Sequence, residues 1–292
     1  MNIKLGTRKS PLALAQAHQV RSLLLALSPE ISVEIVHIVT SGDKFLAQPL
    51  ADIGGKGLFT KEIEEGLLAG ELDIAVHSMK DMPTKLPDGL IIGALLERED
   101  PRDMLLGEGG KSLADLPNGV IFGTSSLRRA AQLKIKRPDA QIVPFRGNVQ
   151  SRLEKLKRGE AQATMLAKAG LNRLGMRDIA GVVLAVEDFL PAIAQGAIGI
   201  ECRAGDSKIR ELLAQLNHQP TQIAVDCERA FLHQLDGSCR TPISGYAIIQ
   251  NQEIFLRGLV AAPDGSTHKT ASLRGDIKDY GKIGAELGKM LQ

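Results

Sequence analysis

Residues 74–81 read Ile-Ala-Val-His-Ser-Met-Lys-Asp, a short apolar run that ends in polar residues. Such a run is typical of a buried parallel strand, and it follows residues 58–68, where Phe59, Ile63 and Leu67 recur at helical spacing. In open α/β sheets, ligands bind just beyond the carboxyl ends of the strands. The stretch therefore predicts an α/β fold with functional residues in the peptide 77–81.

The surrounding chain continues this alternation. Residues 3–5 predict a strand, 11–27 a helix and 33–39 a second strand. A second block, from about 100 to 190, repeats the scheme: a helical pattern, the dipeptide Gly159-Glu160 and an apolar run echo a helical pattern, Gly70-Glu71 and an apolar run. This weak internal repeat predicts two similar α/β halves with a cleft between them.

A third block starts at about residue 217. It opens with a helical pattern that runs to Leu235 and continues with alternating strands such as residues 254–260. This order of elements predicts a smaller α+β domain at the C-terminal end.

The composition of the chain argues against some classes of binding partner. The chain has 292 residues, with 36 basic and 34 acidic side chains and a formal net charge of +2, so no general field attracts nucleic acid or an anionic membrane. Aromatic residues make up 3% and there is no Trp, which leaves few platforms for stacking bases. We expect a small ligand, no nucleic acid and no membrane.

The cysteines and histidines indicate neither disulfides nor metal. Cys202, Cys227 and Cys239 fit no zinc spacing and are too few for a disulfide scaffold, which favours a reducing, cytoplasmic setting. The six histidines include no pair at helical metal spacing, so we predict no metal site. The N-terminal apolar stretch is broken by polar residues and is neither a signal peptide nor a membrane span.

Arginines gather near two predicted helix starts. Residues 123–129 read Gly-Thr-Ser-Ser-Leu-Arg-Arg, and residues 146–149 read Arg-Gly-Asn-Val, with Arg152 next along the chain. Ser and Thr are good N-caps, the first turn of a helix attracts anions, and Arg offers a fork that matches carboxylate or phosphate. The pattern fits either a solvated helix face or a site for several anions.

Two further side chains are candidates for chemistry. Asp81, at the predicted strand end, is either a structural turn residue or a carboxylate that stabilises positive charge and transfers protons. Cys239 lies in a turn-rich stretch beside Arg240, whose charge favours the thiolate. Cys202 and Cys227 are expected to be buried fillers.

These stretches together resemble the hydroxymethylbilane synthase family, also called the porphobilinogen deaminase family. The resemblance runs nearly end to end and rests on motifs that occur in order: residues 7–14, 54–59, 77–81, 97–103, 123–129, 146–149, 195–201 and the Gly-Ser-Cys-Arg-Thr-Pro-Ile loop. It implies a transferase that condenses four porphobilinogen molecules head to tail with loss of ammonia and then releases 1-hydroxymethylbilane by hydrolysis. The substrate is a small molecule, and the family expectation is a monomer.

The resemblance also implies the site. A dipyrromethane cofactor is held through a thioether to Cys239, and Asp81 is the catalytic residue. Further residues are implied to contact the cofactor: Ser78, Lys80, Asp81, Thr124, Ser126, Arg128, Arg129 and Arg146. Others are implied to bind substrate: Arg8, Ser10, Arg146, Arg152 and Gln195. Lys56 and Phe59 are implied to belong to a lid.

The implied fold has two type II, periplasmic-binding-protein-like α/β domains around a cleft and a smaller α+β domain. The implied boundaries are 1–96 with 197–214, then 99–190, then 217–292 with the cofactor cysteine. Periodicity alone does not show the return of 197–214 to the first domain. Lys168, Ala194 and Ser238 depart from the family pattern, but none removes a residue that the mechanism needs.

Two other functions remain open from the residues themselves. A non-catalytic binding protein of the same two-lobed architecture would also place cations in a cleft, but it would need neither Asp81 nor Cys239. A cysteine hydrolase would need a histidine base near Cys239, for which His233 is nearest in sequence.

Overall fold

The structure, a computed structural model, describes residues 1–41, 60–107, 112–237 and 241–292. Contacts divide the chain into two compact units, Met1–Arg98 with Ala197–Gln222, and Glu99–Gly196 with Ile223–Gln292. The chain thus returns to its first unit after completing much of the second. The division into three domains, with 217–292 separate, stays a prediction.

The first unit is built on a five-stranded mixed sheet in the order β2-β1-β3-β10-β4. β1 is parallel to both of its neighbours, whereas β10 is antiparallel to β3 and β4. The strands are β1 (Asn2–Arg8), β2 (Ser32–Ile38), β3 (Ile74–Ser78), β4 (Leu90–Leu95) and β10 (Ile198–Arg203). The predicted strands at the N-terminus and at residue 74 are confirmed.

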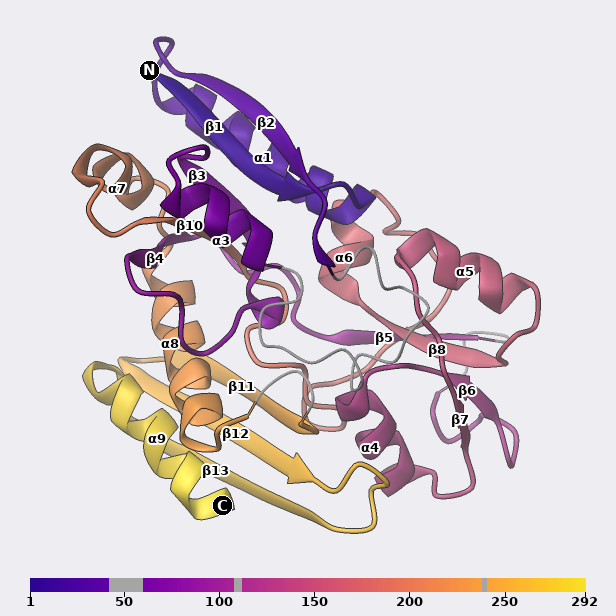
Figure 1. The fold of residues 1–292 in the computed structure, drawn as a ribbon. Coiled ribbons are helices and arrows are strands. Elements are labelled where there is room, and N and C mark those ends of the chain that lie inside the picture. Colours follow the sequence, from indigo (N-terminus) through magenta and orange to yellow (C-terminus); the bar gives the residue numbers. More distant parts are fainter. Residues whose placement is uncertain (42–59, 108–111, 238–240) are drawn as a thin grey trace. The chain divides into compact units, whose positions relative to one another are not determined.

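Helices cover both faces of this sheet (Figure 1). α1 (Pro11–Leu27) and α7 (Ser207–Ala214) pack on the face that carries Val76 and Ile200, and α3 (Lys61–Leu68) packs on the face that carries Ala75. The predicted helix over 11–27 is confirmed. Because side chains alternate along a strand, the end of β3 is held between two helical layers.

The second unit repeats the arrangement with the order β7-β6-β8-β5-β9. Here β5 is antiparallel to β8 and β9, as β10 is to β3 and β4. Its elements are β5 (Asp103–Gly107), β6 (Ile121–Gly123), β7 (Gln141–Val143), β8 (Ala163–Ala167), β9 (Val182–Val183), α4 (Leu127–Lys136), α5 (Val149–Lys157) and α6 (Lys168–Arg173). The shared order confirms the internal repeat and the predicted type II α/β class.

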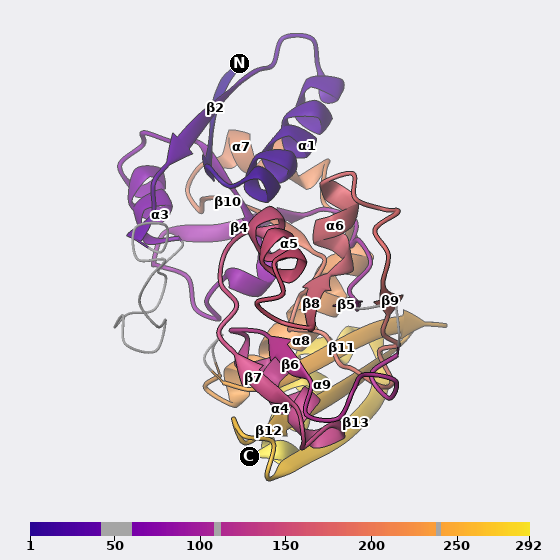
Figure 2. The same ribbon diagram turned by 90° about the vertical axis from the view of Figure 1, so that its right-hand side faces the viewer.

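The C-terminal part of the second unit is a three-stranded antiparallel sheet with helices (Figures 1 and 2). Phe231 of α8 and Leu287 of α9 approach Gly258 in the central strand, where a side chain would collide with both. The elements are α8 (Gln219–Gln234), β11 (Ile243–Gln250), β12 (Glu253–Ala261), β13 (His268–Asp276), a 3-10 turn η3 (Ile277–Asp279) and α9 (Tyr280–Leu291). The predicted smaller α+β region is confirmed. No helix in the described ranges is long and apolar enough to cross a membrane.

The turn between β11 and β12 shows where the backbone is strained. Asn251 and Gln252 have φ angles of 50° and 65°, and both residues are exposed. Two successive left-handed residues form a type I′ hairpin turn, which favours Asn followed by Gly. The Gln at the second position carries a steric cost that glycine would avoid.

Gln252→Gly should therefore raise the free energy of unfolding by about 1 kcal/mol and the melting temperature by about 2–4 °C. Gln250→Gly, at the exposed end of β11, is the matched control and should lower stability by about 0.5–1 kcal/mol, because it adds only backbone entropy. Calorimetry of both variants measures the effect. Equal destabilisation by both would contradict the assignment of strain to position 252.

Candidate functional site

In the first unit, predicted site residues follow the end of β3. Ser78 closes the strand, and Lys80 and Asp81 lie in the 3-10 turn η1 (Met79–Asp81). The Met79 amide donates to the Ala197 carbonyl at 3.0 Å, and the Met82 amide closes the turn on the Met79 carbonyl at 3.2 Å. Pro83 follows and cannot continue a helix. The turn leaves Asp81 exposed at the carboxyl end of a buried strand.

The start of α1 lies beside this turn. The Ser10 hydroxyl accepts a hydrogen bond from the Ala13 amide at 3.3 Å and caps the helix, with Pro11 at its first position. Gln16 in the same helix donates from Nε2 to Ser78 Oγ at 2.8 Å. Arg8 ends β1 and is half-buried. The first unit therefore brings Ser78 into contact with α1, whose start carries Ser10.

In the second unit, the predicted hydroxyl residues lie between β6 and α4. Ser126 is the N-cap, since its Oγ accepts from the Arg129 amide at 3.4 Å, and its own amide donates to Thr124 Oγ1 at 3.1 Å. The Ser125 hydroxyl accepts from the Phe145 amide at 2.9 Å. The capping predicted from sequence is confirmed, and α4 begins directly after this loop.

The two arginines of this helix are not simple surface forks. Arg128 and Arg129 are 6% and 5% exposed, and both are paired with Asp103, which is fully buried. Arg128 Nη2 lies 2.7 Å from Asp103 Oδ2, and Arg129 Nη2 lies 2.8 Å from Oδ1. The Leu190 and Met165 carbonyls accept from the other terminal nitrogens at 2.7 and 2.8 Å. Two guanidinium groups around one carboxylate leave one surplus positive charge.

Gln195 completes this network. Its Nε2 donates to Asp103 Oδ1 at 2.8 Å and to the Pro101 carbonyl at 2.7 Å, and the side chain is 1% exposed. Burial alone would raise the pKa of Asp103, but the charges of Arg128 and Arg129 and their hydrogen bonds outweigh it and hold that pKa far below its ordinary value. Asp103 is therefore a permanent carboxylate that fixes both guanidinium groups.

The other predicted arginines flank the start of α5. Asn148 caps the helix by accepting from the Ser151 amide at 2.9 Å, and Gly147 before it has a φ of 122°. Arg152 Nε donates to the Gly147 carbonyl at 2.9 Å. Arg146 and Arg152 are both half-buried, so this helix start carries two cations on a well-formed cap.

The cysteines within the described ranges are not reactive. Cys202 and Cys227 are buried and unpaired. Burial raises the pKa of Cys202 to about 11 and that of Cys227 to about 12. Both are inert fillers, as predicted. Cys239, Lys56 and Phe59 lie outside the described residues.

Asp103 is the residue that sequence reasoning missed. It stands in the motif of residues 97–103, directly before the apolar run Met-Leu-Leu. An acidic residue at the start of a predicted buried strand was the available signal. An acidic side chain that opens a buried strand needs cationic partners.

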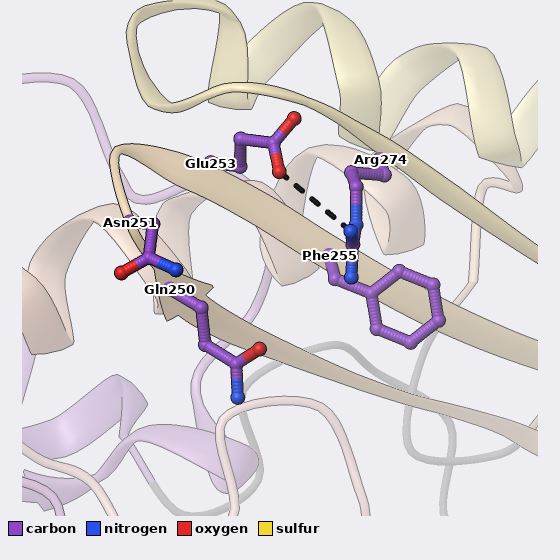
Figure 3. A pocket seen from close by; sticks show the side chains of 5 residues that line it. All are labelled: Gln250, Asn251, Glu253, Phe255 and Arg274. Carbon is purple, nitrogen blue, oxygen red and sulfur yellow. Dashed lines mark ion pairs between the residues drawn. The ribbon is translucent and has the colours of Figure 1, made fainter.

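Two further features of the described residues bear on where a ligand could bind. Within the described ranges, no three His, Cys, Asp or Glu side chains lie close enough to hold a metal ion. Figure 3 shows a shallow pocket at the end of the C-terminal sheet, where Glu253 and Arg274 form an ion pair at 3.7 Å. Its lining residues are Gln250, Asn251, Glu253, Phe255 and Arg274. None of them is a predicted site residue.

Comparison with known proteins gives family matches over nearly the whole chain. Residues 3–211 match the family model described as porphobilinogen deaminase, dipyromethane cofactor binding domain, and residues 222–292 match porphobilinogen deaminase, C-terminal domain. The chain is 54% identical to the chloroplastic porphobilinogen deaminase of Pisum sativum, over 99% of this chain and 80% of that protein. The corresponding protein of Oryza sativa subsp. japonica is also 54% identical, over 98% of this chain and 81% of that protein.

Solved structures with a similar outline include two binding proteins. An ancestral cationic amino acid solute-binding protein gives a TM-score of 0.44 at 17% identity, covering 76% of this chain and 90% of that one. A periplasmic binding protein of Salmonella typhimurium with high arginine specificity gives a TM-score of 0.42 at 14% identity, covering 74% of this chain and 91% of that one.

Removing the charge of Asp103 should destabilise the protein. Asp103→Asn leaves two buried guanidinium groups without their counter-ion, and we expect the free energy of unfolding at pH 7 to fall by about 3–5 kcal/mol. Asp100→Asn is the matched control: its carboxylate pairs with Arg102 at 2.6 Å near the surface, and its loss should cost less than about 1 kcal/mol. Urea unfolding measures both, and equal losses would contradict the account.

The lowered pKa of Asp103 also predicts that the stability difference between the wild type and Asp103→Asn depends on pH. Because the folded pKa of Asp103 lies below the ordinary value of about 3.9, its stabilisation is complete above that value and is lost as the pH falls toward the folded pKa. The stability difference between wild type and Asp103→Asn should therefore shrink by about 1 kcal/mol between pH 5 and pH 3. A difference that stays constant over that range would show that the pKa of Asp103 is not lowered.

Proposed function

Because the chain belongs to the porphobilinogen deaminase family, we propose that Asp81 is its catalytic carboxylate and that Cys239 carries its dipyrromethane cofactor through a thioether. The enzyme is a transferase of tetrapyrrole biosynthesis, a hydroxymethylbilane synthase. It condenses four porphobilinogen molecules head to tail, with release of ammonia at each step, and then releases 1-hydroxymethylbilane by hydrolysis.

The described residues fit a cofactor of this chemistry. Each pyrrole ring carries an acetate and a propionate, so the cofactor and the growing chain are polyanions. The second unit offers the surplus charge of Arg128 and Arg129 around Asp103, together with hydroxyl groups of Thr124 and Ser126 at a helix start. When bound, the cofactor supplies the terminal pyrrole carbon to which the next unit is joined. We assign these four residues, with Ser78, Lys80 and Arg146, to its carboxylates.

The contrast between two aspartates carries the assignment of Asp81. Asp103 is fully buried and neutralised by two arginines, whereas Asp81 is exposed in a turn at the end of a buried strand. Only the second carboxylate is accessible to a substrate. Loss of ammonia from porphobilinogen leaves positive charge on the pyrrole, which a fixed carboxylate stabilises, and the same group can transfer a proton.

The thiols support the choice of Cys239. Cys202 and Cys227 are buried, and their raised pKa values keep them protonated at neutral pH, so neither supplies a thiolate. Cys239 stands beside Arg240, a neighbour that favours the thiolate. A thioether resists hydrolysis, which lets the product leave while the primer stays.

The remaining predicted site residues are proposed to bind the incoming substrate. We assign Arg8, Ser10, Arg146 and Arg152 to the acetate and propionate groups of porphobilinogen, with Lys56 and Phe59 in a lid. Gln195, predicted to bind substrate, also bonds to Asp103, which supports a role in orienting the two arginines. The capped start of α5 suits Arg146 and Arg152 to an anion, since the helix dipole adds to their charge.

We also propose that the enzyme works in the cytoplasm as a monomer, without nucleic acid or membrane. The nearly balanced charge of +2 supports the absence of a polyanionic partner. The unpaired thiols of Cys202 and Cys227 support a reducing compartment.

Asp81→Asn tests the assignment. It keeps the size of the side chain but removes its charge, and kcat for porphobilinogen consumption should fall by about 10²–10⁴-fold. The mass of the attached cofactor should be unchanged, because the thioether is formed by Cys239 and not by Asp81. Asp88→Asn, another exposed carboxylate of the same unit, is the control and should keep wild-type turnover.

Two results would overturn the proposal. One is turnover by Asp81→Asn within a factor of three of the wild type. The other is a wild-type protein that binds porphobilinogen without consuming it, which would favour the non-catalytic binding protein.

A further inference from the structure

A buried polar cluster lies in the first unit, behind the turn that carries Asp81. His77 Nε2 is 3.0 Å from Glu201 Oε2, and the two side chains are 5% and 0% exposed. Glu64 of α3 is 7% exposed and interacts electrostatically with both. Glu201 Oε1 and Glu64 Oε1 have no hydrogen-bond partner among the described residues. The reaction as derived above uses none of these three groups.

The sheet register explains how the cluster forms. Glu201 of β10 stands opposite Ala75 of β3, and His77 stands opposite Gly199. These four residues share one face of the sheet, because side chains of paired strands alternate together. α3 covers that face (Figure 1). The pair therefore joins β10 to the last buried residue of β3.

The second unit contains the same place without the polar groups. Gly6 pairs with Ala75 in one sheet and Gly123 pairs with Thr164 in the other, so Ala75 and Thr164 hold equivalent positions. His77 and Leu166, each two residues further along its strand, are therefore counterparts. Leu106 stands opposite Thr164 in the same way that Glu201 stands opposite Ala75. Leu106 is therefore the counterpart of Glu201.

The helices correspond in the same way. Gly70 after α3 and Gly159 after α5 have φ angles of 74° and 72°, and counting back from them aligns Glu64 with Leu153. Leu106, Leu153 and Leu166 pack in one apolar cluster. One fold thus fills this place once with leucines and once with a histidine and two glutamates.

The fold itself does not require the polar version. Desolvation of a buried ion pair commonly cancels its attraction, and replacing such a pair with well-packed apolar residues is often neutral or stabilising. In the second unit, leucines fill the equivalent place of the same fold. The polar groups of the first unit therefore call for a reason other than stability, and the adjoining element is the turn that carries Lys80 and Asp81.

We propose that His77 and Glu201 are positioning residues that clamp the end of β3 and thereby hold the Ser78–Asp81 turn in its reactive geometry. The proposal deepens the proposed function and rests on the catalytic role of Asp81.

The turn needs such a support. A single 3-10 turn has poor hydrogen-bond geometry, and the Met82 amide closes η1 on the Met79 carbonyl. Three contacts fix the strand before it. Glu201 holds His77 on one face, Gln16 holds Ser78 on the other, and Met79 folds onto Gly199, where any side chain would collide with its sulfur. Of the three, the His77–Glu201 contact is the one that joins two buried polar side chains.

The charges around the pair are compatible with this role. Burial raises the pKa of Glu64, and the nearby Glu201 and Glu65 carboxylates add to the rise, while Thr60 and His77 oppose it. The net shift favours the neutral form of Glu64, which lies beside Glu201.

The experiment compares two changes at the clamp. The double variant His77→Leu/Glu201→Leu copies the leucine pattern of the second unit at two of its three positions and removes both partners of the His77–Glu201 pair. Glu201→Gln removes the charge but keeps an oxygen that accepts a hydrogen bond from His77. Leu166→Met, at the counterpart position of the second unit, is the control for a packing change. Each protein is measured for melting temperature, cofactor mass, and kcat and KM for porphobilinogen.

The double variant should melt at or above the wild-type temperature, keep its cofactor and keep KM within twofold, while kcat falls at least tenfold. Glu201→Gln should retain at least a third of the wild-type kcat, and Leu166→Met should match the wild type. The proposal is overturned if the double variant keeps kcat within twofold, if it fails to fold or loses its cofactor, or if Glu201→Gln loses as much kcat as the double variant.

These results are separable from a failure of the Asp81 assignment. That failure appears as turnover by Asp81→Asn with the clamp intact. A failure of the clamp appears as normal turnover by the double variant with Asp81 intact.

Discussion

One buried carboxylate holds the two buried arginines of the second unit. Asp103 opens β5 in the interior of the second unit, and both Arg128 and Arg129 reach it from the first turn of α4. Without it, two guanidinium groups would be buried unpaired, at a cost of several kcal/mol each. With it, the three side chains form a buried group with a surplus of one positive charge. The pairing therefore stabilises the second unit, and the proposed cofactor site uses the same surplus charge.

The two units use one strand order for different tasks. The first ends β3 in a short turn with an exposed aspartate, whereas the second ends β8 directly in α6. The proposed catalytic carboxylate thus lies in one copy of the fold, and the buried cation pair lies in the other. Polar groups in the interior follow the same division, since His77 and Glu201 in one unit correspond to leucines in the other. The residues proposed for catalysis and cofactor binding follow β3 in the first unit and β6 in the second.

Local patterns in the sequence were sufficient to predict many of the helices, strands and helix caps. The helix over 11–27, the strand at residue 74 and the cap at Ser126 all follow from periodicity and capping, which depend on neighbouring residues. The insertion of β10 between β3 and β4 does not, because that pairing joins residues more than a hundred positions apart. For the same reason the sequence left both a solvated helix face and an anion site open for Arg128 and Arg129, and it did not identify Asp103 as their partner. Burial is a long-range property that one sequence reveals poorly.

The claim that ties these features together is that the chain carries a covalent primer on Cys239. The most direct test is the intact mass of the purified protein beside that of Cys239→Ala. The account predicts that the wild type exceeds the mass of its sequence by one dipyrromethane and that the variant does not. A wild-type protein at the mass of its bare sequence, still unmodified after incubation with porphobilinogen, would contradict it.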